Sequence, residues 1–323
     1  MLEFHRDWNY FAMDMGLEVI CSGIGASLGL LYLIYVISSR KKRTDLKGKV
    51  VFITGTTSGL GKACAIAFYE AGCHLILAGR NRASLEQLQI QLQSTQSSKV
   101  KGQRTEILEL DLEDVKVITA KAEDAFQLFG QVDVLVNNAG VSYRGQVEDT
   151  LLDVDMKVML VNYFGHVALT KALLPHMIGS GGGYIVGISS VQGRIAIPFR
   201  SSYAASKHAF QAFFDSLRAE IHDRNVHVCV VSPGYIQTNL SQNAVCGDGS
   251  KYGTTDSTTA SGMTPEEVAR HVVSAVTWNQ SEIICAPVLH RLLICLRTLL
   301  PNLYFWIMNK RARKQKKDYT KRS

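Results

Sequence analysis

The chain has 323 residues, of which 46% are hydrophobic and 20% are charged, and its formal net charge is +7. This composition suits one large globular domain with appendages, and no internal repeat or long low-complexity segment interrupts it. From Lys310 to the end there are eight Lys or Arg residues and one acidic residue, a surplus of seven that equals the net charge. The rest of the chain is therefore close to neutral, which argues against a nucleic-acid-binding fold.

The N-terminal region has the pattern of a membrane anchor. A short segment, residues 1–18, has charged side chains that are mostly acidic. It precedes residues 19–39, which contain no charged side chain. At about 1.5 Å per residue this segment spans about 30 Å, enough for the bilayer core. A basic linker, 40–48, begins with Arg40-Lys41-Lys42-Arg43. Without a clean cleavage site, the pattern favours an uncleaved single-pass anchor with the following domain in the cytosol.

Two other features bear on the compartment. The seven cysteines form no Cys-x-x-Cys pair and no visible disulfide or zinc framework, so we expect no metal site and a reducing environment. In the opposite sense, Asn239-Leu240-Ser241 and Asn279-Gln280-Ser281 are glycosylation sequons. They would be used only if the domain were lumenal.

A glycine-rich turn follows the first predicted strand. Residues 49–53 form an apolar, β-branched run that leads into Gly55-Thr56-Thr57-Ser58-Gly59-Leu60-Gly61, and residues 63–71 have a helical pattern. Gly55 lets the chain turn off the strand, Gly59 leaves room for a pyrophosphate, and Gly61 allows helix and strand to pack closely. The helix N-terminus then offers free N–H groups to phosphates. A plain glycine-rich turn is the alternative, but the strand–turn–helix context favours nucleotide binding.

Further strands alternate with helical patterns along the chain. Apolar runs at 74–78, 105–110 and 132–136, and runs ending at Ser190 and Pro233, read as buried strands. This alternation predicts an α/β fold of the Rossmann type, a doubly wound parallel sheet in a single domain. A cofactor should then lie beyond the carboxyl ends of the strands.

The second strand ends in Gly79-Arg80-Asn81-Arg82. NAD-selective Rossmann enzymes place an acid here to bind the ribose 2′-hydroxyl, whereas a guanidinium matches a phosphate. The prediction is therefore NADP(H), with Arg80 at the 2′-phosphate. A solvated charge pair at a strand end is the alternative.

The most informative motif is Tyr203-Ala204-Ala205-Ser206-Lys207, thirteen residues after Ser190. It places a phenol and an ammonium on the same face of a helix, where the lysine would lower the phenol pKa toward the working range. Ser190 could hydrogen-bond the substrate oxygen that Tyr203 protonates. Alone, the motif would also fit an ordinary amphipathic helix; with the nucleotide turn it indicates carbonyl–alcohol chemistry.

Together these motifs resemble the short-chain dehydrogenase/reductase superfamily, over about residues 49–287. The resemblance implies that Asn162, Ser190, Tyr203 and Lys207 are catalytic, with Ser190 and Tyr203 contacting substrate and Asn162 helping to hold a water. It also implies a possible homodimer, and it places NADP(H) against Gly55, Thr57, Ser58, Gly59, Leu60, Gly61, Arg80, Asp111, Leu112, Asn138, Ala139, Gly140, Tyr203, Lys207, Pro233, Gly234, Ile236 and Thr238.

The substrate pocket is expected in three variable segments. Tyr143, Arg144 and Gln192 are candidate lining residues, together with the rest of 191–199 and a Gly/Ser/Thr-rich loop, 239–263, expected to act as a mobile lid. Ile195, Ile197 and Phe199 could contact an apolar chain, and Arg144, Arg194 or Arg200 an anionic group. Core packing and solvated charges are the alternatives.

The end of the chain leaves two interpretations open. Residues 288–309 are apolar but interrupted by Arg291, Arg297 and Pro301, and residues 310–323 form a basic tail. This could be an interfacial segment that lies against anionic lipid, or an exposed disordered tail after a last core helix.

Within the superfamily the layout is most similar to the membrane-anchored dehydrogenase/reductase member 7 group, and especially to its 7B branch. The predicted anchor, Ser142-Tyr143-Arg144-Gly145, Ile197-Pro198-Phe199-Arg200 and the basic tail carry that resemblance. It implies a lipid-modifying reductase of the endoplasmic reticulum membrane, or alternatively the peroxisomal membrane. Acyl- or alkyl-dihydroxyacetone phosphate, steroids and retinoids are candidate substrates. A non-catalytic, membrane-anchored interaction protein on the same fold is the alternative function.

Overall fold

A computed structural model describes residues 27, 29–31, 43–94 and 102–320. The chain divides into two compact units, 1–43 and 44–323, and all elements below belong to the second. Among the helices of the described residues, none is long and apolar enough to cross a bilayer. Most of the predicted anchor, 19–39, lies outside the described residues.

A seven-stranded parallel sheet forms the centre of the second unit, in the order β3-β2-β1-β4-β6-β7-β9. The order reverses between β1 and β4, which creates the crevice where Rossmann-type sheets bind their ligands. The strands are β1 (Val50–Thr54), β2 (His74–Gly79), β3 (Thr105–Glu109), β4 (Val134–Asn137), β6 (Gly183–Ile188), β7 (Val226–Pro233) and β9 (Glu282–Cys285).

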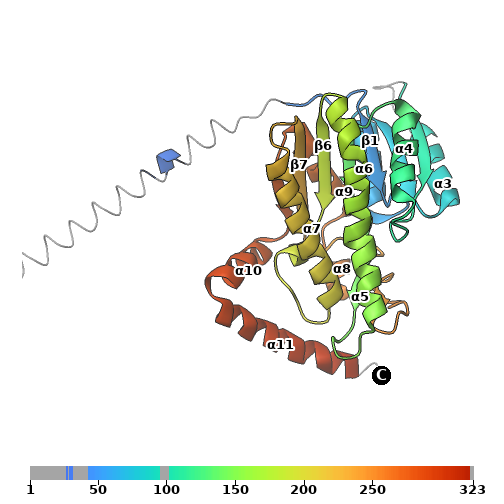
Figure 1. Cartoon of the computed structure of the whole chain (residues 1–323). Helices are drawn as coiled ribbons and strands as arrows, with labels where there is room; N and C mark the ends of the chain where they lie inside the picture. The colour runs from blue at the N-terminus through green and yellow to red at the C-terminus, as the bar shows by residue number, and fades with distance from the viewer. Residues whose placement is uncertain (1–26, 28, 32–42, 95–101, 321–323) are drawn as a thin grey trace, which may run out of the picture. The chain divides into compact units, whose positions relative to one another are not determined.

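Helices cover both faces of this sheet, because its strands carry apolar side chains on both sides. In β1, Val51 and Ile53 pack with helices α2 (Gly59–Glu70), α3 (Arg82–Ser94) and α9 (Pro265–Thr277). Val50 and Phe52 of the same strand pack on the opposite face with α4 (Ile118–Phe129), α6 (Gly165–Gly179) and α7 (Ser201–Glu220). Figure 1 shows α6 and α7 on one side of the strands. The predicted doubly wound fold is confirmed.

Three smaller features lie around the crevice. A short helix α5 (Leu152–Met159) continues through a π-helical turn, Leu160–Phe164, into α6. Strands β5 (Tyr143–Arg144) and β8 (Val245–Cys246) form a separate two-stranded parallel sheet, which joins the segment after β4 to the loop after β7. That loop, predicted as a lid, also contains the short helix α8 (Ser257–Ala260).

Two helices end the described chain, α10 (Val288–Leu299) and α11 (Pro301–Thr320). In Figure 1, α11 turns back at an angle to α10 below the main body of the sheet and its helices. The interpretation of the basic tail as disordered is therefore wrong for residues 310–320, which are helical.

Candidate active site

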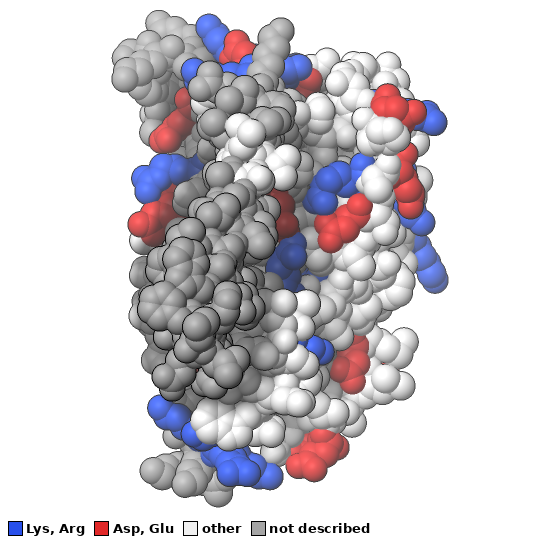
Figure 2. Space-filling view, turned by 90° about the vertical axis from the view of Figure 1, so that its left-hand side faces the viewer, with Lys and Arg blue, Asp and Glu red and all other residues white. Residues whose placement is uncertain are grey.

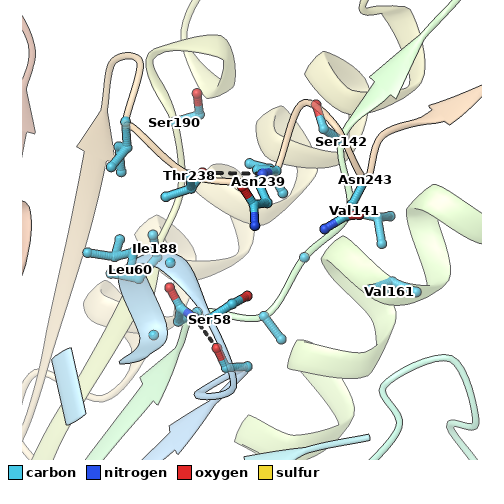
Figure 3. A pocket seen from close by; sticks show the side chains of 18 of the residues that line it. Ser58, Leu60, Val141, Ser142, Val161, Ile188, Ser190, Thr238, Asn239 and Asn243 are labelled. Atoms are coloured by element: carbon cyan, nitrogen blue, oxygen red, sulfur yellow. Dashed lines mark hydrogen bonds between the residues drawn. The ribbon is translucent and has the colours of Figure 1, made fainter. Parts of the chain in front are cut away.

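A cleft of about 640 Å³ lies over the carboxyl ends of the parallel strands, at the reversal of strand order. Figure 3 shows its two ends: Ser58 and Leu60 come from the turn after β1, whereas Ser142, Ser190 and Asn243 lie at the other. All eighteen residues predicted to contact the cofactor, from Gly55 to Thr238, line this one cleft. Segments far apart in sequence thus form a continuous surface.

The glycines of the first turn are required by close packing. A Cβ on Gly61 would lie 2.1 Å from the Gly55 carbonyl oxygen, a backbone atom that cannot move aside. Gly55 and Gly59 have φ angles of +71° and +54°, which favour glycine. The backbone of this turn therefore stays bare at the start of α2. Such a surface fits the pyrophosphate of a dinucleotide at a helix N-terminus.

A network of hydrogen bonds fixes this turn to the end of β4. Thr54 Oγ1 accepts hydrogen bonds from the amides of Asn138 and Ala139, at 2.9 and 3.0 Å. The Asn138 side-chain amide donates to the Thr54 carbonyl at 2.8 Å. Asn138 thus lines the cleft and also ties together the two strands that border the crevice.

Arg80 lines the cleft directly after β2 and is exposed. Among the described residues none forms an ion pair with it, whereas Arg82 pairs with Glu86 at 3.0 Å. Gly79 leaves no carboxylate at the position where an acid would bind a ribose 2′-hydroxyl. A free guanidinium without that acid fits a 2′-phosphate.

Tyr203 and Ser190 meet at the other end of the cleft. Ser190 follows β6 and caps a short 3₁₀ turn, Val191–Gly193, where its Oγ accepts from the Gln192 amide at 3.1 Å. Burial raises the pKa of Tyr203 above its ordinary value, although a side-chain hydrogen bond with Ser190 and the positive charge of Arg144 oppose this shift. The expectation that Lys207 lowers this pKa toward the working range is therefore wrong: burial of the phenol outweighs the opposing effects, and the cation among them is Arg144.

Lys207 lies one turn after Tyr203 on α7, as the spacing predicts. Its side chain is 4% exposed, and burial lowers its pKa from 10.5 to about 8. Its Nζ donates to the Ile188 carbonyl at 2.8 Å and lies 6.0 Å from the centre of the Tyr203 ring. One side-chain ammonium therefore joins the end of β6 to the helix that carries Tyr203.

Asn162 lies in the π-helical turn and does not line the cleft. Its Oδ1 accepts from the Val141 amide at 2.8 Å, and its Nδ2 donates to the Val141 carbonyl and to Ser206 Oγ. The side chain therefore joins the segment after β4 to α7. Its expected role in holding a water stays a prediction.

Sequence reasoning missed His166, which is fully buried behind the same segment. Its Nδ1 lies 3.0 Å from Asn137 Oδ1, and its Nε2 lies 2.7 Å from the Ala139 carbonyl. Burial, with a smaller contribution from the nearby Lys207 charge, lowers its pKa to about 3, so the ring is neutral. It holds the 137–139 segment that lines the cleft.

The substrate end differs from the expectation at several residues. Tyr143 does not line the cleft: it is fully buried, and its hydroxyl bonds to Thr150 and to the Gln146 carbonyl. Because neighbouring strand residues face opposite ways, Arg144 of the same strand does line it. Gln192 also lines it, and its buried Oε1 has no hydrogen-bond partner among the described residues.

The three residues expected to contact an apolar substrate chain, Ile195, Ile197 and Phe199, do not line the cleft. Ile195 and Ile197 pack against the C-terminal helices, and Phe199 does not reach the cleft. Arg194 is paired with Glu282 and also does not line it. These residues follow Ser190 in sequence, but after the turn that follows β6 they lie away from the cleft.

A buried ion-pair cluster supports the substrate end. Arg144 Nε and Nη2 donate to Asp256 Oδ2 at 2.9 and 2.6 Å, and Arg200 Nη2 donates to the same oxygen at 3.1 Å. Burial alone would raise the pKa of Asp256, but the two guanidiniums hold it below its usual value. The carboxylate of Asp256 thus joins Arg144 of β5 to Arg200 at the start of α7. Sequence reasoning missed Asp256, because the loop that carries it has no motif.

Sequence reasoning also missed other lining residues. Tyr235 and Ser142 line the cleft, whereas Lys251, which also lines it, lies within the loop 239–263 that was predicted to contribute. Ser142 was quoted only as part of a motif, and its Oγ accepts from Arg144 Nη1 at 2.6 Å. No spacing rule distinguishes these side chains from their neighbours.

Residues 49–247 match the short chain dehydrogenase family. The chain belongs to the short-chain dehydrogenase/reductase family. It is 49% identical over 291 residues to "Dehydrogenase/reductase SDR family member 7B" of Rattus norvegicus, covering 90% of both chains. It is also 46% identical over 306 residues to "Dehydrogenase/reductase SDR family protein 7-like" of Drosophila melanogaster, covering 95% of this chain and 93% of that one. The predicted similarity to the member 7B branch is confirmed.

Solved structures of short-chain dehydrogenases and reductases share the fold. One from Streptomyces avermitilis has a TM-score of 0.68 at 29% identity, covering 82% of this chain and 97% of that one. L-Sorbose reductase from Gluconobacter frateurii, complexed with NADPH and L-sorbose, has a TM-score of 0.65 at 25% identity, covering 76% and 97%. A member of the family from Burkholderia phymatum in complex with NAD has a TM-score of 0.71 at 23% identity, covering 80% and 96%. Family members of this fold thus include NAD and NADPH complexes.

Proposed function

We propose that this short-chain dehydrogenase/reductase is a membrane-anchored, NADP(H)-dependent reductase of lipophilic carbonyl compounds. The observation that carries the proposal is the single cleft that joins the bare glycine turn and Arg80 to Ser190, Tyr203 and Lys207. A nicotinamide cofactor bound there would supply a hydride. The residues of the chain supply the proton and hold the cofactor and the substrate in place.

The roles of the side chains follow from their surroundings. Ser190 is fixed by the turn that it caps, so its hydroxyl can polarise a substrate carbonyl beside Tyr203. Because burial favours the neutral phenol, Tyr203 is suited to donate a proton in the reductive direction. Lys207 fixes the start of α7 against β6 through the Ile188 carbonyl and leaves its remaining N–H groups for ribose hydroxyls.

The preference for NADP(H) rests on Arg80 and on the missing acid at Gly79. Arg80 is exposed at the nucleotide end of the cleft and has no ion-pair partner in the described part of the chain. A 2′-phosphate would give this guanidinium a bidentate partner, and a 2′-hydroxyl would not.

Among the candidate substrates, a lipid ketone with a phosphate group is best supported. Arg144 and Lys251 line the substrate end and place two basic side chains there. An anionic group would find positive charge there, as in acyl- or alkyl-dihydroxyacetone phosphate. Gln192 Oε1 offers an unpaired acceptor for a substrate hydroxyl. Steroids and retinoids would leave that charge without a partner.

The location is proposed from the sequence. The uncharged segment 19–39 would anchor the chain in the endoplasmic reticulum membrane, or alternatively the peroxisomal membrane, with the basic residues 40–43 and the catalytic unit on the cytosolic side. A homodimer is proposed from the family resemblance.

The test is NADPH consumption by membranes that contain the full chain, against a panel of lipid ketones, steroids, retinals and acyl-dihydroxyacetone phosphate. Tyr203→Phe should abolish turnover and leave NADPH binding intact, because it removes only the proton donor. Tyr69→Phe is the matched control, since its buried hydroxyl on α2 has no partner among the described residues. Retained turnover in Tyr203→Phe would refute the mechanism. No turnover in wild type, with NADPH still bound, would favour the non-catalytic interaction protein.

A further inference from the structure

The outer side of α10 is an apolar surface without a partner in the described chain. None of this helix's described residues is buried. Val288, Leu289 and Leu292 are 70%, 65% and 59% exposed, and Leu299 at its end is 75% exposed. Large apolar side chains this exposed, and this close together, mark an interaction surface.

Helix α11, which follows α10 directly, also has an exposed stripe along one of its faces. Leu303, Trp306, Lys310 and Arg313 are exposed and recur at intervals of three and four, so they form one stripe along the helix. The stripe is apolar in the first two turns and basic after them. The opposite face carries Tyr304, which is buried.

The inner face is fixed to the wall of the cleft. Tyr304 and Met308 pack with Ile195, and the Tyr304 hydroxyl donates to the Ala196 carbonyl, five to six residues after Ser190. Arg311 Nη2 donates to the Tyr235 hydroxyl at 3.0 Å, and Tyr235 lines the cleft. Because these contacts hold the inner face against residues near the cleft, the outer face of the helix has a fixed orientation.

The charged residues of this segment are all basic. The sequence has no acidic residue from Val288 to Lys317. Arg297 lies 4.9 Å from the Phe305 ring centre, and Lys310 lies 3.6 Å from that of Trp306, so cations sit directly on the exposed aromatic rings. At the lower edge of Figure 2, Lys and Arg side chains lie beside uncharged surface, with a group of acidic side chains next to them.

An anionic lipid surface matches this pattern. Exposed Leu and Trp side chains with Lys and Arg at their border are typical of segments that lie in the membrane interface. A second copy of the chain, pairing through the same face, would instead bring basic residues opposite basic residues. That pairing would lack compensating acids in this segment, whereas anionic headgroups supply them.

We propose that the outer face of α10 and α11, the C-terminal docking face, lies in the interface of a membrane that contains anionic lipid. The face is defined by Val288, Leu289, Leu292 and Leu299 of α10 and by Leu303, Trp306, Lys310 and Arg313 of α11. Docking there would hold residues 195–197 and Tyr235, and with them the substrate end of the cleft, next to the bilayer. The inference adds to the proposed reaction a second membrane contact, separate from the segment 19–39.

Tryptophan quenching in the full chain can test this face separately from the N-terminal anchor. The chain has three tryptophans, and two are comparably exposed, Trp306 at 54% and Trp278 at 48%. Two single-tryptophan variants are made, one that keeps Trp306 and one that keeps Trp278 at the end of α9, with the others replaced by Phe. Each is reconstituted in nanodiscs with or without phosphatidylserine, using lipid brominated near the carbonyl end of the acyl chain.

The expected result is quenching of Trp306 fluorescence by about twofold or more, because interfacial residues lie about 5–10 Å into the bilayer. Trp278 should change little. Omitting phosphatidylserine, or introducing Lys310→Glu with Arg313→Glu, should reduce the quenching of Trp306. Equal responses of Trp306 and Trp278, or protection of Trp306 that depends on protein concentration, would overturn the proposal, the latter in favour of a second copy.

The outcome is distinguishable from that of the proposed reaction. Quenching is read without substrate or NADPH, and the mechanism is tested by Tyr203→Phe turnover in the same nanodiscs. Unquenched Trp306 with normal Tyr203-dependent turnover would refute only the docking face. Quenched Trp306 without turnover in wild type would refute only the reaction.

Discussion

Replacing Lys207 with Met should stabilise the protein and inactivate it. Burial lowers the Lys207 pKa from 10.5 to about 8, a difference that corresponds to about 3 kcal/mol of cost for the charged form at neutral pH. Met has similar length and no charge. Against this gain, the variant loses the hydrogen bond to the Ile188 carbonyl and leaves that oxygen unpaired, at a cost of about 1–2 kcal/mol. The net expectation is a gain of about 1–2 kcal/mol in the free energy of unfolding near pH 7.

The pH dependence of the stability difference between wild type and variant tests the reasoning more sharply than the difference at pH 7 alone. Between pH 8 and 10.5 the unfolded chain still binds the Lys207 proton and the folded chain has lost it, so the stability of wild type rises with pH. The Lys207→Met variant lacks this contribution. The advantage of the variant should therefore shrink, by about 3 kcal/mol over this window, and reverse.

The assay is chemical denaturation of wild type and variant without cofactor, in steps from pH 7 to 10.5. Lys171→Met, on the exposed side of α6, is the control and should follow wild type throughout. NADPH binding and turnover are measured in parallel, and both should fall in Lys207→Met. A difference between wild type and Lys207→Met that stays constant with pH would refute the reasoning, because it would mean that burial does not lower the pKa of this lysine.

Other substitutions test separate parts of the site. Arg80→Ala should raise KM for NADPH about tenfold or more and leave KM for NADH nearly unchanged, since only the 2′-phosphate contact is lost; an unchanged preference would refute the assignment. Gly61→Ala should abolish NADPH binding measured by fluorescence, because its Cβ would lie 2.1 Å from the Gly55 oxygen. Arg144→Gln should raise the Tyr203 pKa, so the loss of reductase activity at alkaline pH should move to higher pH, and an unmoved pH profile would contradict this. Thr264→Ala removes the capping box of α9 and should cost about 1 kcal/mol of stability, visible as a lower Tm without a change in KM.

The sequence predicts the sheet well where a strand is buried on both faces. The runs at 74–78 and 105–110 differ from β2 and β3 by one residue each, because continuous apolar side chains leave little freedom in register. The edge strand β9 was not predicted: it has four residues, begins with an exposed glutamate and lacks that continuous pattern. The paired strands β5 and β8 have two residues each, and only their contact across the fold makes them strands.

The substrate end was predicted least well, and the reason is local geometry. Tyr143 and Arg144 were equal candidates in the sequence, and the alternation of β5 directs one into the interior and the other to the cleft. Ile195 and Ile197 have the composition of a substrate wall, but α10 and α11, about a hundred residues later, pack against them. Asp256 belongs to a loop without a motif, and its importance depends on two arginines from β5 and the start of α7.

The sequence by itself determined the family, the nucleotide turn and the catalytic spacing, because each depends on short-range geometry: a glycine that must have no side chain, or a tyrosine and a lysine one helical turn apart. The tertiary structure alone decided which side chains share the cleft, which cations act on Tyr203, and which face of the C-terminal helices stays uncovered. Those properties arise from contacts between residues far apart in the chain. Periodicity and motif spacing contain no information about such pairs, since they describe only neighbours along one element.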